Sequence, residues 1–446
     1  MATTRKLSRA ALAVLVVLCG VTMVLGFANK DRCTGPEFDV WGRSGPDYTQ
    51  RSYADVCYSD IQHLWIGRDI DRHVFPYVDG ALEDGQLTGG SVEYPVLTGV
   101  LIWAGAFFVD NDAGFLLASA VLLAPFGLLT AWLLGRMAGW RSLWWAIGPP
   151  LVLYAFHNWD LPVVAVAVAA FYVTLLGKRP LHQRAAIAAV LLGLGFALKL
   201  YPAIFVIPLA LYVLTNGERR DNRYDLVGAL RVVAIAAGTG IAANLPFMLA
   251  GFEGWWASFE FQGQRKVDVS TNSIWFWAFR PLSDPDNDTF QSAMNVVSPT
   301  LMLASFAVAG VLGWQRYRRD GVYPLLPVAA AMLCGFLLLH KVHSPQYTLW
   351  LLPMFVLLRI PWGWIVAYLI ADLAMGIGIF RWFAVLGEGA GGGIYDGFAA
   401  QAVAVGVWGR AALLVALFFV FLRADPVIRG RDRVTDFAHS RLVTCG

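Results

Sequence analysis

The sequence predicts an all-α, polytopic helical membrane protein with about 12 transmembrane helices. Of its 446 residues, 58% are hydrophobic and only 15% are charged, whereas soluble domains carry about a quarter charged residues. Long apolar runs recur along the whole chain, and they lack the alternation that barrel strands would show. The formal net charge is +3 and the basic residues form no stripe, so a nucleic-acid partner is not indicated.

The apolar runs define one integral membrane domain that covers residues 1–446. They are residues 10–28, 94–109, 115–134, 142–156, 160–177, 185–198, 201–215, 226–250, 295–314, 322–340, 346–359, 361–380 and 397–422. The first run follows a basic start and lacks a cleavage pattern, which predicts an uncleaved signal anchor with a cytoplasmic N-terminus. Basic breaks such as GKRPLHQR and the tail 423–446 are also expected in the cytoplasm. Two cytoplasmic termini require an even number of crossings, so we expect one run of the pair 94–109 and 115–134 not to span.

Two long polar segments are expected on the extracytoplasmic side, residues 29–93 and residues 251–294. Both mix tryptophan with charged residues, which is typical of helices that lie in the headgroup plane. Cys33 and Cys57 fall in the first of these loops. They are either free thiols or, in an oxidising compartment, a disulfide worth about 3 kcal/mol that closes a loop of roughly 25 residues.

Short polar motifs stand in a fixed order at the expected outer ends of the helices. They are YSDIQHLWIGRDI from residue 58, EYPVLTG from 93, HNWDLP from 157, ALKLYPAIFVIP from 197 and HKVHSPQYTLWLLP from 340. In this order they resemble the GT-C superfamily of polyprenyl-phosphate-sugar-dependent glycosyltransferases. Within it, the chain is most similar to the actinobacterial polyprenyl-phosphomannose-dependent α-mannosyltransferases, which include the phosphatidylinositol mannoside enzymes.

The resemblance implies a glycosyltransferase of the plasma membrane. It would move a sugar, with mannose favoured over arabinose, from a polyprenyl-phosphate donor to a hydroxyl of a glycolipid or glycan acceptor on the extracytoplasmic face. Inversion, a carboxylate base and independence of metals and other cofactors are expected with it. The alternatives are a secondary transporter or lipid-linked sugar flippase, for which the sequence lacks the inverted repeats, and a membrane scaffold. The sequence leaves the acceptor and the protein partners open.

Asp60 is the candidate base, because the family places its catalytic aspartate in the first outer loop ahead of a helix that lies along the membrane. Ile61, Leu64 and Trp65 recur at helical spacing and predict the apolar face that would dock this helix on the membrane domain. Two alternatives remain open. Asp60 can simply cap the helix, or another acid of the loop can be the base: Asp39, Asp55 or Glu93.

Lys199 is the first candidate ligand for the donor phosphate. It follows an apolar run at the outer side, where an ionisable group is unfavourable unless it faces a polar cavity. Snorkelling of its ammonium to the headgroups is the alternative. Lys341, His343 and Arg265 reach the same outer face and are further candidates for the phosphate.

The remaining outer polar residues are candidates for binding the sugar or the acceptor. They are Tyr58, Glu93, His157, Asn158, Asp160, Asn272, Gln346 and Tyr347. Asp160 can instead hold Lys199, and an Asn-x-Asp sequence is also common in plain turns.

Asp372 and Arg410 lie in the middle of the last two apolar runs. If these helices are antiparallel, the two residues differ by roughly 8 Å in height, which an arginine side chain nearly reaches. A structural ion pair is our preferred interpretation, and a proton or ion pathway is the functional alternative.

Overall fold

The computed structural model describes residues 7–216, 224–389, 391, 393 and 396–428. Almost all regular structure in this part of the chain is helical, which confirms the predicted all-α class. Within it, seven helices are long and apolar enough to cross a membrane. They are α1 (Arg9–Asp31), α5 (Asp112–Ala138), α9 (Leu181–Leu198), α11 (Leu226–Ala250), α14 (Asp288–Asp320), α17 (Trp362–Gly387) and α18 (Phe398–Arg423).

Shorter apolar helices lie among these long ones. They are α4 (Val96–Ala106), α8 (Asp160–Leu176), the 3₁₀ helix η2 (Tyr201–Phe205) continued by α10 (Val206–Asn216), α15 (Leu325–Leu339), and η3 (Pro345–Tyr347) continued by α16 (Thr348–Leu357). The chain is therefore a polytopic membrane protein, and its twelve crossings stay a prediction. Most of the predicted tail 423–446 lies outside the described residues.

The apolar run 142–156 does not form one continuous helix. It is divided into η1 (Gly139–Ser142), α6 (Leu143–Ala146) and α7 (Pro149–Tyr154). Gly148 precedes two consecutive prolines, which lack the N–H donors that would continue a helix. The run therefore packs as short helical pieces that contact α1 and α16.

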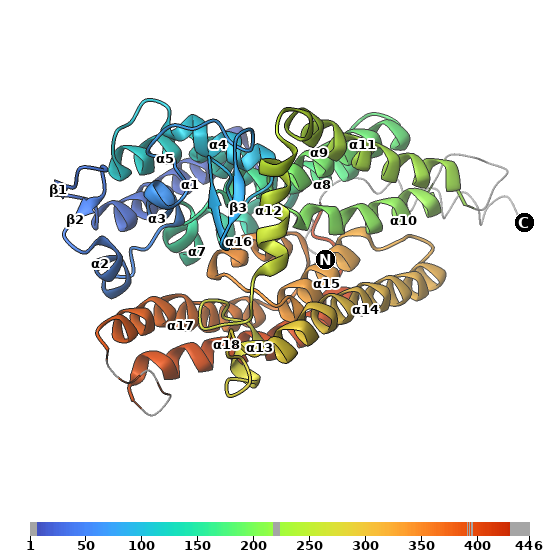
Figure 1. The fold of residues 1–446 in the computed structure, drawn as a ribbon. Coiled ribbons are helices and arrows are strands. Elements are labelled where there is room, and N and C mark those ends of the chain that lie inside the picture. Colours follow the sequence, from blue (N-terminus) through green and yellow to red (C-terminus); the bar gives the residue numbers. More distant parts are fainter. Residues whose placement is uncertain (1–6, 217–223, 390, 392, 394–395, 429–446) are drawn as a thin grey trace, which may run out of the picture.

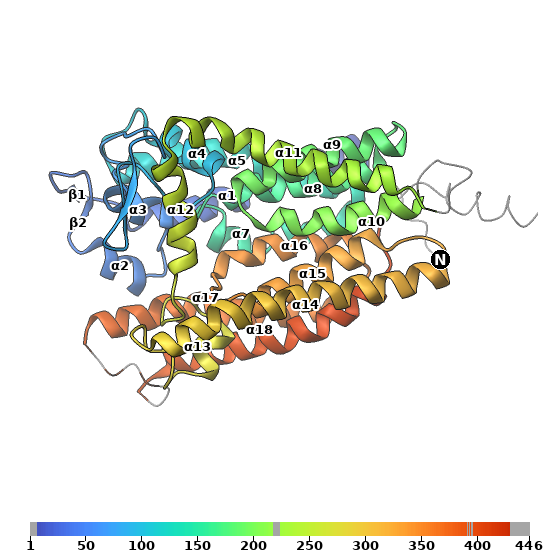
Figure 2. The same cartoon turned by 45° about the vertical axis from the view of Figure 1, so that its right-hand side comes forward.

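The long helices form two layers (Figure 1). One layer holds the N-terminal helices up to α11, and the other holds α14, α17 and α18. Helix α12 (Phe252–Gln264) crosses from the first layer to the second, where α13 (Ile274–Ala278) follows it. Figure 2 shows that α12 lies at the same end of the bundle as the small elements of residues 29–93. The two predicted outer loops therefore meet at one end.

The first loop is compact and carries its own small elements. They are the hairpin β1 (Glu37–Phe38) with β2 (Ser44–Gly45), helices α2 (Tyr48–Ala54) and α3 (Asp60–Gly67), and the hairpin β3 (Ala81–Glu83) with β4 (Gln86–Thr88). Cys33 and Cys57 form a disulfide, which resolves the open alternative. The predicted apolar face of α3 is confirmed, because Ile61, Leu64 and Trp65 are all buried.

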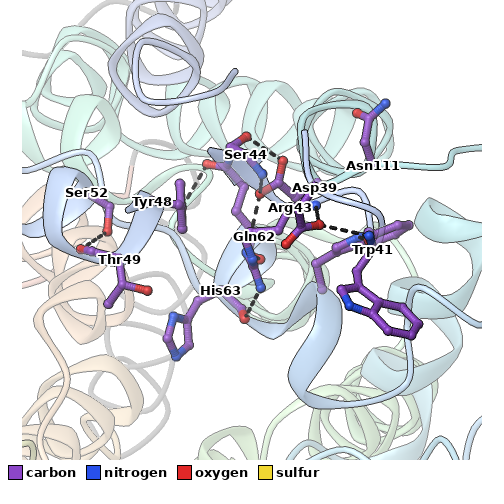
Figure 3. Close-up of polar contacts among 12 residues, drawn as sticks. Asp39, Trp41, Arg43, Ser44, Tyr48, Thr49, Ser52, Gln62, His63 and Asn111 are labelled. Atoms are coloured by element: carbon purple, nitrogen blue, oxygen red, sulfur yellow. Dashed lines mark hydrogen bonds and ion pairs between the residues drawn. The ribbon is translucent and has the colours of Figure 1, made fainter. Parts of the chain in front are cut away.

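A polar network ties this loop to the membrane helices (Figure 3). Arg43 forms an ion pair of 3.3 Å with the buried Asp112 at the start of α5, and the Ser44 hydroxyl donates to the same carboxylate. The guanidinium of Arg43 also donates to the backbone carbonyls of Gln62 and His63 on α3. Helix α3 is thus fixed on its apolar side by packing and on its polar side by Arg43.

Asp372 on α17 and Arg410 on α18 form the predicted buried pair, with 3.7 Å between Oδ1 and Nη1. The Thr348 hydroxyl donates to the same Asp372 oxygen. The pairing is confirmed, while its structural role stays a prediction.

Candidate functional site

A cavity of about 740 Å³ lies at the loop end of the bundle, where both outer loops meet the ends of the apolar helices. Ten of the thirteen predicted site residues line it: Tyr58, Asp60, Glu93, His157, Asn158, Lys199, Arg265, Asn272, Gln346 and Tyr347. Residues from five separate sequence motifs therefore share one chamber.

Asp60 is the first residue of α3, and its carboxylate accepts hydrogen bonds from three side chains. Tyr58 Oη donates at 2.8 Å, Asn158 Nδ2 at 2.6 Å and Tyr94 Oη at 3.5 Å. The N-cap position belongs to Ser59, and α3 has no side-chain cap bond at this end. The Asp60 side chain is thus turned to the cavity rather than to the helix terminus, contrary to the capping alternative.

The environment of Asp60 favours its ionised form. Burial opposes the charge, but neighbouring His157 and His63 and the hydrogen bonds from Tyr58 and Asn158 together bring the pKa of Asp60 below its ordinary value. Burial in turn lowers the pKa of His157 to about 4, against the opposing influence of Asp60. At neutral pH His157 is therefore uncharged, and the hydrogen bonds from Tyr58 and Asn158 remain to stabilise the Asp60 carboxylate.

Lys199 follows the end of α9 and is buried beside Asp60. Its Nζ donates to Asp160 Oδ1 at 2.7 Å and to Asn158 Oδ1 at 3.1 Å. The ammonium also lies 5.5 Å from the ring centre of Tyr94 and 5.6 Å from that of Trp350. Lys199 is held in the cavity wall instead of snorkelling to the headgroups, and two of its three N–H donors have protein partners.

The carboxamide of Asn158 connects the carboxylate to the cation. Its Nδ2 donates to Asp60 and its Oδ1 accepts from Lys199. This double contact determines the orientation of the amide, because only its nitrogen can donate to a carboxylate. Asp160, which also accepts from Trp350 Nε1 at 2.7 Å, completes the chain of contacts. Asp160 itself does not line the cavity, so its alternative role of holding Lys199 is the one observed.

The other predicted cations differ in their positions. Arg265 lines the cavity, but Lys341 lies outside its wall and donates to Gly263 O and Asn295 Oδ1. His343 is also outside the wall, buried, with Nδ1 3.1 Å from the carbonyl oxygen of Leu337. These contacts leave Lys199 and Arg265 as the predicted phosphate ligands that face the chamber.

The predicted sugar-binding residues offer both acceptors and aromatic faces. Asn272 Oδ1 and Gln346 Oε1 are buried and have no hydrogen-bond partner in the described part of the chain. The Tyr347 ring stacks on Trp350 at 3.9 Å, which gives the chamber a flat aromatic wall. Glu93 is paired with Arg68 at 2.8 Å, so its carboxylate is already neutralised.

Several cavity residues were missed by the sequence analysis: His63, Arg68, Tyr94, His340 and Trp350. All five fall inside the quoted motifs, so their place in the motifs was the available signal. His63 lies one helical turn after Asp60, on the same face of α3, which also could have identified it. Among the described residues there is no group of three or more His, Cys, Asp or Glu side chains arranged for a metal.

Comparison with known proteins identifies the family to which the chain is similar. The sequence model of the family described as mannosyltransferase (PIG-M) matches residues 160–385. GPI mannosyltransferase 1 of Saccharomyces cerevisiae is 26% identical over 243 residues, which are 53% of this chain and 57% of that protein. No solved structure matches the chain.

A second relative has a more explicit name. It is the polyprenol-phosphate-mannose-dependent alpha-(1-2)-phosphatidylinositol mannoside mannosyltransferase of Mycobacterium tuberculosis, 28% identical over 304 residues, which are 67% of this chain and 63% of that protein. The chain thus spans about three fifths of the length of the curated relatives it matches. The family match covers half of the chain and includes the Lys199, Arg265 and Gln346 regions of the cavity. The chain belongs to the mannosyltransferase (PIG-M) family.

Proposed function

We propose that the protein is a membrane glycosyltransferase that moves mannose from a polyprenyl-phosphate donor to a hydroxyl of a glycolipid or glycan acceptor. Family membership and the names of the two relatives support this function. They give no support to the alternative of a transporter or flippase. We place the cavity on the extracytoplasmic face of the plasma membrane, with both termini in the cytoplasm, as the distribution of basic loops predicts.

One observation carries the proposal: a single carboxamide, that of Asn158, joins a carboxylate to a cation in the wall of one cavity. Because its two contacts measure 2.6 and 3.1 Å, the Asp60 carboxylate and the Lys199 ammonium lie less than about 10 Å apart. That separation allows the two groups to flank one bound sugar.

The reaction that this arrangement fits is an inverting displacement. The acceptor hydroxyl oxygen forms a bond to the anomeric carbon, and the bond from that carbon to the phosphate oxygen breaks. Asp60 takes the hydroxyl proton as general base. Lys199, through its remaining N–H, and Arg265 neutralise the departing phosphate, so that we expect no metal and no other cofactor.

Other cavity side chains orient the carboxylate or are available for the sugar. Tyr58 and Asn158 hold the carboxylate oriented, and the unpartnered oxygens of Asn272 and Gln346 are available for sugar hydroxyls.

The direct test is transfer from radiolabelled polyprenyl-phosphate mannose to membrane lipids and glycans. We expect activity in membranes with the wild-type protein and a loss of about 10²–10⁴-fold with Asp60→Asn. Asp55→Asn is the matched control, because Asp55 belongs to the same loop, is exposed and does not line the cavity. An active Asp60→Asn enzyme, or an inactive Asp55→Asn enzyme, would refute the assignment of the base.

A further inference from the structure

Lys30, near the C-terminal end of α1, is a buried lysine that has no role in the site described above and lies outside the family match. Only 2% of its surface is exposed. Burying an ammonium is unfavourable unless it is hydrogen-bonded. In the described structure its Nζ donates to the backbone carbonyl of Tyr58, at 2.7 Å.

That carbonyl belongs to the segment that carries the candidate base. Tyr58 Oη donates to Asp60 Oδ1 at 2.8 Å, and the Asp60 backbone N–H donates to the carbonyl of His157 at 2.8 Å. The Ser59 hydroxyl donates to the carbonyl of Phe156 at 2.6 Å. The peptide that leads into α3 is therefore held by residues 156–157 on one side, and Lys30 holds it through Tyr58.

The end of α1 contacts this segment a second time. Cys33, three residues after Lys30, forms the disulfide with Cys57, which directly precedes Tyr58. The covalent bond brings the segment to the end of α1, and the Tyr58 backbone N–H donates to the carbonyl of Ser52 at 3.1 Å. The hydrogen bond from Lys30 acts on the next peptide, between Tyr58 and Ser59, because it helps to fix the direction of the Tyr58 carbonyl, which also lies 3.2 Å from His157 Nδ1.

We propose that Lys30 is a positioning residue for the transfer reaction: it holds the Tyr58 peptide so that the Tyr58 hydroxyl and the Asp60 carboxylate face the acceptor. The inference rests on the proposed function. Lys30 does not line the cavity, so it acts through Tyr58 and not by contact with substrate. Its loss should affect the chemical step more than the binding of either substrate.

The test uses Lys30→Met in the full-length protein, purified in lipid nanodiscs, with polyprenyl-phosphate mannose and the acceptor that the wild type uses. We expect kcat to fall about 10–100-fold while KM for each substrate stays within about twofold. Lys30→Arg, which keeps a cationic donor, should recover a large part of kcat. Thermal unfolding of each variant shows whether it is folded.

Arg32→Met is the matched control. Arg32 lies two residues further along, is exposed, and donates to the carbonyl of Asp55 in the same loop. We expect its kcat to stay within about twofold of wild type. If Lys30→Met does not fold, Lys30→Gln, which keeps a shorter polar donor, must show the same fall in kcat at unchanged KM.

Three results would overturn the inference. One is a Lys30→Met enzyme with wild-type kcat, another is a loss of kcat equal to that of Arg32→Met, and the third is a rise in KM that accounts for the whole loss. Each presupposes an active wild type. Absence of transfer by the wild type would instead contradict the proposed function, so the two failures are distinguishable.

Discussion

Two buried pairs of opposite charge in this protein are built in different ways. Lys199 and Asp160 approach to 2.7 Å beside a cavity, and Asn158 extends the contact to Asp60. Arg410 and Asp372 approach only to 3.7 Å, and neither of them lines the cavity. In the described structure, Arg410 Nε and Nη1 also lack hydrogen-bond partners.

This difference indicates that the Lys199 and Asp160 pair belongs to a candidate site, whereas the Arg410 and Asp372 pair is a contact between two helices. Both pairs are ionisable, buried and formed between distant parts of the sequence, so burial and charge do not distinguish them. Asp372 accepts a hydrogen bond from Thr348, but only in the first pair is the contact between the two charged groups itself a close hydrogen bond, and only that pair adjoins a chamber that can hold a ligand. An intramembrane charge is therefore a stronger functional candidate when its hydrogen-bonding network opens onto a cavity.

Among the variants that test this comparison, Asn158→Leu should show the largest loss of activity, because it disrupts the cavity network. It removes one hydrogen bond each from Asp60 and Lys199, so we expect kcat to fall about 10²-fold or more. Asn244→Leu is the control, because Asn244 is also a buried asparagine and accepts from Trp255 Nε1 away from the chamber. Transfer by Asn158→Leu at the rate of Asn244→Leu would show that the carboxamide does not organise the site.

Removal of the disulfide should have the next largest effect, mainly on stability. A Cys33→Ala/Cys57→Ala variant loses the cross-link over a sequence separation of 24 residues, for which about 2–4 kcal/mol of stability is expected. We expect a lower midpoint of thermal unfolding and only a modest loss of kcat, since Lys30 still holds Tyr58. An unchanged midpoint would mean that the packing of the loop alone keeps it in place.

The pH dependence of kcat/KM should report the ionisation of the Asp60 carboxylate. Its lowered pKa means that the active carboxylate is present at neutral pH and is lost only as the pH falls through that value. Tyr58→Phe removes a hydrogen bond to the charged form, so the acid limb of kcat/KM should move upward by about one pH unit. An acid limb that stays in place would indicate that another group titrates there.

The fold was largely predictable because its long helices are continuous apolar segments. The division of residues 142–156 into short helices was missed, although Gly148, Pro149 and Pro150 provided a local signal. The small hairpins of the first loop were not predicted either. Strands of two or three residues leave too short a pattern for alternation to be recognised.

The site was predictable to the extent that each motif marks the outer end of a helix. Asp60, Asn158 and Lys199 were singled out separately and are brought together by the fold. The choice between neighbouring histidines was not predictable: His340 lines the cavity, while His343, three residues later, does not. After α15 the chain leaves helical geometry, so helical spacing no longer indicates which side chain faces the chamber.

The smallest expected effect is that of replacing the whole Asp372 and Arg410 pair. Asp372→Leu alone leaves an uncompensated buried guanidinium and should cost about 3–5 kcal/mol of stability. The double variant Asp372→Leu/Arg410→Met removes both charges, and such replacements are often nearly neutral. We expect its unfolding midpoint and its kcat to lie close to those of the wild type. A proton or ion pathway through these residues would require the charges themselves, so a stable but inactive double variant would refute the structural interpretation and remove the contrast with the cavity network.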